Sequence, residues 1–228
     1  MTRTTNARIA GVSFLLYIVA GIGTLVVFGR ATAGSDIGAK LTTLAQHTTA
    51  VGVVIVLLLL MSFSALAWAV TLYAITRQED PDLAMLAMIC RVAEGVMGGY
   101  GISSVLALRS LAAAGAPGAA DAAASHALGA YLMSDDASLT ATFFAVGSTL
   151  FSYLLLRGRM IPRPLAWLGV AASVLLVIAL PLQLAGFLGD AIAGLIWLPM
   201  LAFEVPLAIW FLTRGAGAER RTPARQPA

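Results

Sequence analysis

The chain has 228 residues, of which 60 % are hydrophobic and 11 % are charged, and its mean hydropathy is +0.91. Soluble domains carry roughly a quarter of charged residues, so this composition excludes a soluble globular protein and indicates an integral membrane protein. The net charge of +3 comes mostly from Arg residues at the ends of apolar segments, a pattern that argues against nucleic-acid binding. With a single cysteine, Cys90, and no Cys/His cluster, we expect no internal disulfide, no metal site and no other cofactor.

The first apolar segment covers residues 9–29 and is uninterrupted by charge for about 20 residues. It follows two Arg residues and precedes Ala31-Thr32-Ala33, so it superficially resembles a secretory signal peptide with a small-residue cleavage site. The apolar core of a signal peptide is only about 7 to 15 residues long. Because this segment is longer, an uncleaved membrane-spanning helix is the better interpretation.

Five further apolar segments follow, each long enough to cross a bilayer as a helix of about 20 residues. Between the first two segments, residues 30–47 predict a polar loop or a short interfacial helix. The longest predicted loop contains an Ala/Gly-rich stretch over 112–124, after which residues 126–132 are a candidate for a short surface helix. The further predicted helices cover residues 49–76, 83–108, 138–156, 165–188 and 191–213.

These segments predict one all-α domain over residues 1–214, a polytopic membrane protein with six transmembrane helices, followed by a disordered tail over 215–228. With six spans both termini share one side, and that side receives ten Arg residues against three basic residues on the other. Cytoplasmic loops carry the excess of Lys and Arg, so both termini are expected to be cytoplasmic. The ten are Arg3, Arg8, Arg77, Arg157, Arg159, Arg163, Arg214, Arg220, Arg221 and Arg225, and the three are Arg30, Lys40 and Arg109.

The segment 83–108 carries Arg91 and Glu94, which lie three residues apart and therefore share one helix face. A charged side chain near the bilayer centre costs about 2.5 to 3.5 kcal/mol, so this face must point toward protein or trapped water. Counting about 1.5 Å per residue from the cytoplasmic helix ends places both residues near the depth of Glu204. We predict that Arg91 pairs with Glu204, with Glu94 as the alternative, and that the other acid is protonated, binds a cation or faces water.

Four more polar side chains fall near that depth and complete the candidate binding site. Hydroxyl groups commonly join membrane helices without any ligand, and a buried ion-pair network can be purely structural, so both alternatives stay open. No zinc-protease, GxSxG, Walker or dinucleotide-binding motif occurs in the sequence, and no catalytic residue is assigned. The four residues are Tyr17, Ser62, Ser148 and Thr149.

Short motifs follow one another in a characteristic order along nearly the whole chain. They are Arg8-Ile9-Ala10-Gly11 in the first helix, Arg91-x2-Glu94 in the third, Tyr153, Arg157 and Pro162-Arg163 around the turn after the fourth, and Glu204 with Trp210 in the last. In these motifs the chain resembles a bacterial membrane family called domain of unknown function 4386. The resemblance implies a six-helix protein of the inner membrane, and it implies no assigned activity.

The first functional hypothesis is a non-enzymatic, multi-pass protein of the bacterial inner membrane that binds or moves a small or lipophilic solute at the centre formed by Arg91, Glu94 and Glu204. Coupling to protons belongs to this hypothesis. The alternative is a membrane-embedded interaction or regulatory protein, and an intramembrane enzyme is third. A cavity lined by the charged set would favour the first hypothesis, and a dry, fully paired network would favour the second. The lipid bilayer is the one partner that the sequence predicts, and it predicts no oligomeric state.

The predicted topology can be checked with reporter fusions. A reporter after the C-terminus should lie in the cytoplasm, and reporters inserted in the segments 30–47 and 112–124 should lie outside, because ten basic residues are predicted on the inner side and three on the outer side. A C-terminal reporter found outside would contradict the prediction, most simply by indicating five spans after cleavage near Ala33.

Overall fold

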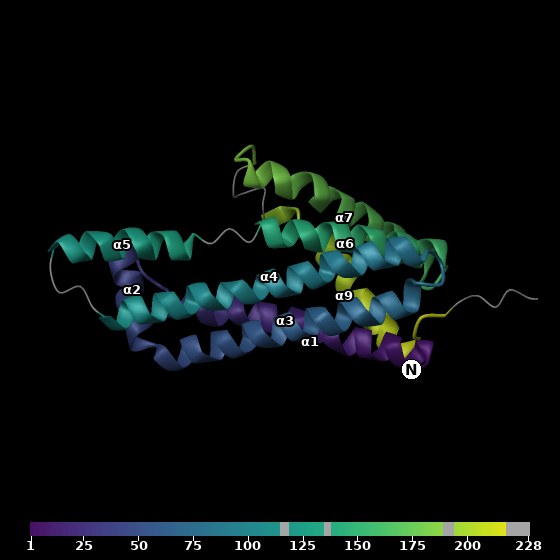
Figure 1. Cartoon of the computed structure of the whole chain (residues 1–228), viewed down its shortest axis with the longest axis horizontal. Coiled ribbons are helices and arrows are strands. Elements are labelled where there is room, and N and C mark those ends of the chain that lie inside the picture. The colour runs from purple at the N-terminus through teal and green to yellow at the C-terminus, as the bar shows by residue number, and fades with distance from the viewer. Residues whose placement is uncertain (115–118, 135–137, 189–193, 218–228) are drawn as a thin grey trace, which may run out of the picture.

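The computed structural model describes residues 1–114, 119–134, 138–188 and 194–217, and everything reported below lies in these ranges. Within them the chain forms α-helices and no strand, as the sequence predicts. Most of the predicted tail, residues 218–228, lies outside the described residues. The helices, labelled as in Figure 1, are α1 Arg3–Ala31, α2 Ile37–Gln46, α3 Thr48–Thr76, α4 Pro81–Ala114, α5 Ala119–Met133, α6 Ser138–Arg157, α7 Arg163–Leu184 and α9 Leu198–Thr213.

Five helices are long and apolar enough to cross a membrane, and they are α1, α3, α4, α6 and α7. They match five of the predicted spans and make the chain a membrane protein. The sixth predicted span, 191–213, differs, because α9 has 16 residues and residues 189–193 lie outside the described part of the chain. A helix of this length measures about 24 Å, less than the roughly 30 Å of a hydrocarbon core.

The predicted helix over 165–188 was too long at its end. In the structure α7 stops at Leu184, and Gly186 follows with a φ of 78°, a conformation that costs glycine little. The N–H of Gly186 donates to the carbonyl of Gln183 at 2.9 Å, and the N–H of Phe187 donates to that of Leu182 at 2.8 Å. This pair of bonds is a Schellman motif, which satisfies the last carbonyls and turns the chain away.

The connecting segments contain more helix than the sequence suggested. The Ala-rich stretch 112–124, predicted as a loop, belongs to α4 up to Ala114 and to α5 from Ala119. Alanine has the highest helix propensity, which explains the difference. Of the two alternatives predicted for residues 30–47, a polar loop or a short interfacial helix, the structure has a short helix, α2. Asp36 caps α2 by accepting a hydrogen bond of 2.9 Å from the N–H of Ala39, and this bond, together with one from the hydroxyl of Ser35, lowers the pKa of the Asp36 carboxyl.

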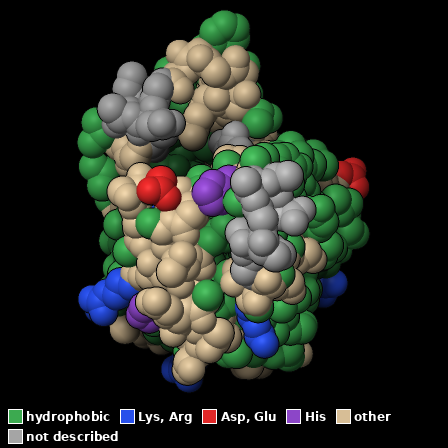
Figure 2. Space-filling model, turned by 90° about the vertical axis from the view of Figure 1, so that its left-hand side faces the viewer, with side chains coloured by type: hydrophobic (Ala, Val, Ile, Leu, Met, Phe, Trp, Pro, Cys, Tyr) green, Lys and Arg blue, Asp and Glu red, His purple; other side chains and the backbone are tan. Residues whose placement is uncertain are grey.

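The long helices form a closed ring in chain order. Helix α1 packs on α3, α3 on α4, α4 on α6, α6 on α7 and α7 on α9, and α9 returns to α1. Figure 1 shows α1, α3 and α4 running lengthwise, with α2 and α5 at the end opposite to the N-terminus. Seen from that end, Figure 2 shows few charged side chains.

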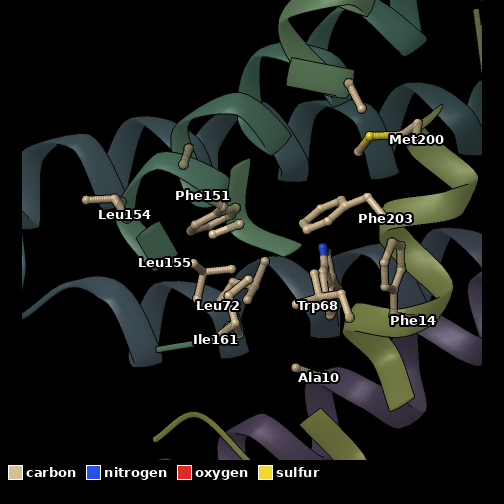
Figure 3. Packing of buried hydrophobic residues seen from close by; sticks show 14 of the residues in the cluster. Ala10, Phe14, Trp68, Leu72, Phe151, Leu154, Leu155, Ile161, Met200 and Phe203 are labelled. Carbon is tan, nitrogen blue, oxygen red and sulfur yellow. The ribbon is translucent and has the colours of Figure 1, made fainter. Parts of the chain in front are cut away.

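Aromatic side chains fill the centre of the ring. Phe14 of α1 stacks on Trp68 of α3 with ring centroids 4.0 Å apart, and Trp68 meets Phe211 of α9 at 6.0 Å. Phe203 of α9 and Phe151 of α6 lie beside them in the same cluster, as Figure 3 shows. These rings join helices from both halves of the chain, so the centre of the ring is protein and not lipid.

The outside of the ring is apolar. Large hydrophobic side chains are exposed along the spans, among them Leu25 at 75 %, Phe63 at 67 % and Ile178 at 58 %. In water such a surface would be an aggregation liability, whereas in a bilayer it faces hydrocarbon. The exposed side chains thus support the assignment of these helices as membrane spans.

Closure of the ring between α1 and α9 depends on Gly11. A Cβ at this position would lie 2.8 Å from the backbone oxygen of Ala208 and 2.8 Å from Leu212 Cγ. Because a backbone atom cannot move aside cheaply, Gly11→Ala should lower the free energy of unfolding by about 1 to 3 kcal/mol, measured by thermal unfolding in detergent. Gly29→Ala on the same helix meets nothing within 4 Å and should be neutral or slightly stabilising. Equal stability of the two variants would contradict the closed ring.

Candidate functional site

The charged face of α4 is buried, as the sequence predicts. Arg91 has no exposed surface and Glu94 is 3 % exposed. Arg91 Nη1 lies 3.0 Å from Glu94 Oε2, so the two residues form an ion pair within one helix. A buried guanidinium without an anion is strongly unfavourable, and the carboxylate one turn along supplies the counter-charge without help from another helix.

Tyr17 of α1 joins this pair to the opposite wall of the ring. Its hydroxyl donates a hydrogen bond of 2.8 Å to Glu94 Oε1. One oxygen of Glu94 therefore faces Arg91 while the other accepts from Tyr17. The hydrogen bond and the ion pair bring Tyr17, Glu94 and Arg91 together in one cluster.

Two residues of α6, Phe144 and Gly147, hold Arg91 from the other side. The guanidinium carbon lies 4.5 Å from the centroid of the Phe144 ring, a cation–π contact. A Cβ on Gly147 would lie 2.8 Å from Arg91 Cγ, so only glycine leaves room for the arginine stem. The sequence reasoning missed both residues. An aromatic residue and a glycine three positions apart share a helix face, and this spacing is the signal in the sequence that could have identified them.

Glu204 is not the partner of Arg91, and that prediction was wrong. Among the described residues, Glu94 is the carboxylate within ion-pair distance of Arg91. Counting residues along a helix gives the depth of Glu204 but not the direction in which its side chain points. Glu204 is 8 % exposed, and its Oε1 has no hydrogen-bond partner in the described part of the chain. It is a second, unpaired acid.

The three predicted hydroxyl residues fall in three different places. Ser62 of α3 lines the same cleft as Glu94 and Glu204. Ser148 of α6 lines a small internal void, with about 10 Å³ of space, that also borders Glu204. Thr149 donates to the carbonyl of Ala145 in its own helix at 2.8 Å, which is a local bond and not part of the site.

A half-open cleft of about 1070 Å³ contains the polar centre. Its walls come from α1, α3, α4, the end of α5, α6 and α9, and Tyr17, Glu94 and Glu204 all reach it. Its other lining residues are mostly apolar. On the α4 side, Gly95, Gly98 and Gly101 contribute no side-chain volume, which widens the cleft. The volume is at the upper end of the roughly 300 to 1,000 Å³ of typical ligand sites.

The two cavities meet at Glu204. The small void lies on one side of this residue among Phe14, Trp68 and Ser148, and the cleft lies on the other. Among the residues described, no other side chain borders both. No group of three His, Cys, Asp or Glu residues that would hold a metal occurs in the described ranges. The site is therefore an acid-lined cleft, with its arginine buried behind the carboxylates.

The fold and the site define a helical, multi-pass membrane protein with buried ionisable side chains inside a ring of helices. A family model for "Domain of unknown function (DUF4386)" matches residues 9–215, and the chain belongs to this family. The resemblance seen in the sequence motifs is thereby confirmed. No curated protein and no solved structure matches the chain.

The ion pair can be measured with a double-mutant cycle. Glu94→Gln should lower the free energy of unfolding of the detergent-solubilised protein by about 3 to 5 kcal/mol, because it leaves Arg91 buried without its anion. Adding Arg91→Met to Glu94→Gln should recover much of the loss. Thermal unfolding of the single and double variants gives the interaction free energy.

Glu204→Gln is the matched control, since it makes the same chemical change at the unpaired acid. Its interaction free energy with Arg91→Met should be clearly smaller than that of Glu94→Gln. A larger value for the Glu204 cycle would mean that Arg91 turns to Glu204 in the membrane, and the pair described above would be refuted.

Proposed function

We propose that this protein binds or moves a small or lipophilic solute in the cleft, at the centre formed by Arg91, Glu94 and Glu204. The observation that carries the proposal is the position of two buried carboxyl groups at the wall of a large and mostly apolar cleft. Pockets of this kind combine apolar walls, which supply affinity, with a few polar groups, which fix orientation. Intramembrane ionisable groups beside a cavity are typical of solute and proton pathways.

The rim of the cleft supports entry of the solute from the lipid. Val96 at 63 %, Tyr100 at 73 % and Leu201 at 46 % are lining residues that are also exposed. They are apolar or aromatic and belong to helices whose outer faces are apolar. A lipophilic solute dissolved in the bilayer would reach the cleft without crossing a layer of charged groups.

The proposal includes six spans in a bacterial inner membrane with both termini in the cytoplasm. The excess of basic residues on one side supports this orientation. Helix α9 completes the sixth span, because a short apolar helix is accommodated when the bilayer thins locally or flanking residues snorkel. Packing of α9 on α1 supports a sixth span in the same layer as the long helices.

One observation favours a second candidate, an interaction or regulatory protein whose ion pair is purely structural. Tyr17, Glu94 and Arg91 contact one another and need no ligand to do so. Such a network specifies helix register without any chemistry. The cleft and Glu204 have no role in this alternative, so filling the cleft distinguishes the two functions.

Gly98→Phe tests the proposed function. Gly98 lines the cleft and a Cβ there meets nothing within 4 Å, so the start of a larger side chain is accommodated and its ring should occupy cleft volume. Protein purified from membranes should retain a lipophilic small molecule, detected by mass spectrometry after organic extraction, and Gly98→Phe should retain much less. Gly52→Phe is the control, since its Cβ also meets nothing within 4 Å but Gly52 does not line the cleft. Equal retention by all forms would contradict a binding function.

A further inference from the structure

The charges at the cleft do not balance. Arg91 is neutralised by Glu94 and has no exposed surface, and it is not among the residues that line the cleft. Glu94 is engaged on both oxygens, by Arg91 and by Tyr17. Glu204 is therefore the surplus acid of the centre. No Lys, Arg or His side chain of the described residues lines the cleft.

The carboxyl group of Glu204 is buried and one of its oxygens has no partner among the described residues. The residue is 8 % exposed, and its Oε1 is buried without a hydrogen bond to any described residue. Burying an ionised carboxylate without a partner costs several kcal/mol, so the group is neutralised by a proton or by a bound cation. Because the side chain reaches the cleft, a cation in the cleft is placed to do so.

The other walls of the cleft suit a cation with a bulky apolar body. Tyr100 and Trp197 line the cleft with aromatic rings, whose faces attract positive charge. Met61, Met97 and Met133 add flexible and polarisable side chains that adapt to irregular shapes. A small hydrated metal ion would leave most of this apolar volume unused.

We infer that the cleft takes a lipophilic cation, anchored by the carboxylate of Glu204, and this inference rests on the proposed function. A lipophilic anion would place its charge against two carboxyl groups with the guanidinium screened behind one of them. A neutral molecule would bring no counter-charge, and Glu204 would then have to hold a proton to be neutralised. Charge complementarity thus selects a cation among the solutes that the apolar walls accept.

Binding of the cation displaces a proton from Glu204, because the same oxygen atoms hold either one. The groups that face Glu204 are Tyr17 from α1 and the Arg91–Glu94 pair from α4. Helix α7 also packs on α9, and it carries no titratable side chain after Arg163. Raising the pH therefore strengthens binding of the cation, since fewer protons compete for the carboxylate.

The test compares two probes of nearly equal size and shape and of opposite charge, tetraphenylphosphonium and tetraphenylborate. Each radiolabelled probe is equilibrated by dialysis against the full-length protein in lipid nanodiscs, and binding to empty nanodiscs is subtracted. Tetraphenylphosphonium should bind saturably and more tightly as the pH rises, and tetraphenylborate should not compete. Glu204→Gln should weaken binding about tenfold or more, whereas Glu79→Gln, an acid at the turn between α3 and α4, should not change it.

Several outcomes would overturn the inference. They are binding of tetraphenylphosphonium that is independent of pH in the wild-type protein, equal binding of tetraphenylborate, and full binding by Glu204→Gln. Glu204→Asp, which keeps the charge, should bind more tightly than Glu204→Gln even if both variants are less stable. If the cation does not bind but Gly98→Phe still abolishes retention of a natural solute, the inference fails while the proposed function stands. If neither effect is seen, both fail.

Discussion

The structure depends on one constraint, the burial of an arginine in the middle of an apolar helix. A guanidinium at this depth is tolerated only when an anion and further contacts surround it. Glu94 supplies the anion, Phe144 supplies a ring face, and Gly147 supplies the space for the arginine stem. Tyr17 then fixes the second oxygen of Glu94. Burial of Arg91 therefore determines how α1, α4 and α6 approach one another.

The cleft follows from the same α4 helix. One of its faces carries the charged pair, and next to it Gly95, Gly98 and Gly101 present almost no side-chain volume. Small residues in membrane helices usually allow a neighbouring helix to approach closely. Here Gly95 does so against α3, whereas a Cβ at Gly98 or Gly101 would meet nothing within 4 Å. Part of the glycine face thus makes a helix contact, and part of it lines the cleft.

Much of this arrangement could be predicted from the sequence, and the failures share a physical cause. Hydropathy predicts where spans occur, and the spacing of Arg91 and Glu94 places both on one helix face. Neither gives the rotation of one helix relative to another, so Glu204 was wrongly predicted to pair with Arg91, and Phe144 was missed. Helix ends depend on local bonds such as those around Gly186, which composition does not reveal. The prediction of a loop over the Ala-rich residues 112–124 was wrong because it gave weight to Gly and Pro and too little to the high helix propensity of alanine.

Glu94 and Glu204 are both buried, but they differ in whether the fold supplies them with partners. Glu94 has a counter-charge at 3.0 Å in Arg91 and a hydrogen bond from Tyr17, so the fold alone explains this acid. Glu204 is buried to a similar extent, yet the fold leaves one of its oxygens without a partner and places it between a void and a large cleft. A fold that needed only to neutralise Arg91 would have no use for a second carboxyl group at this depth, because each buried acid adds a desolvation cost. The surplus acid is therefore the feature of this protein that a structural role does not explain.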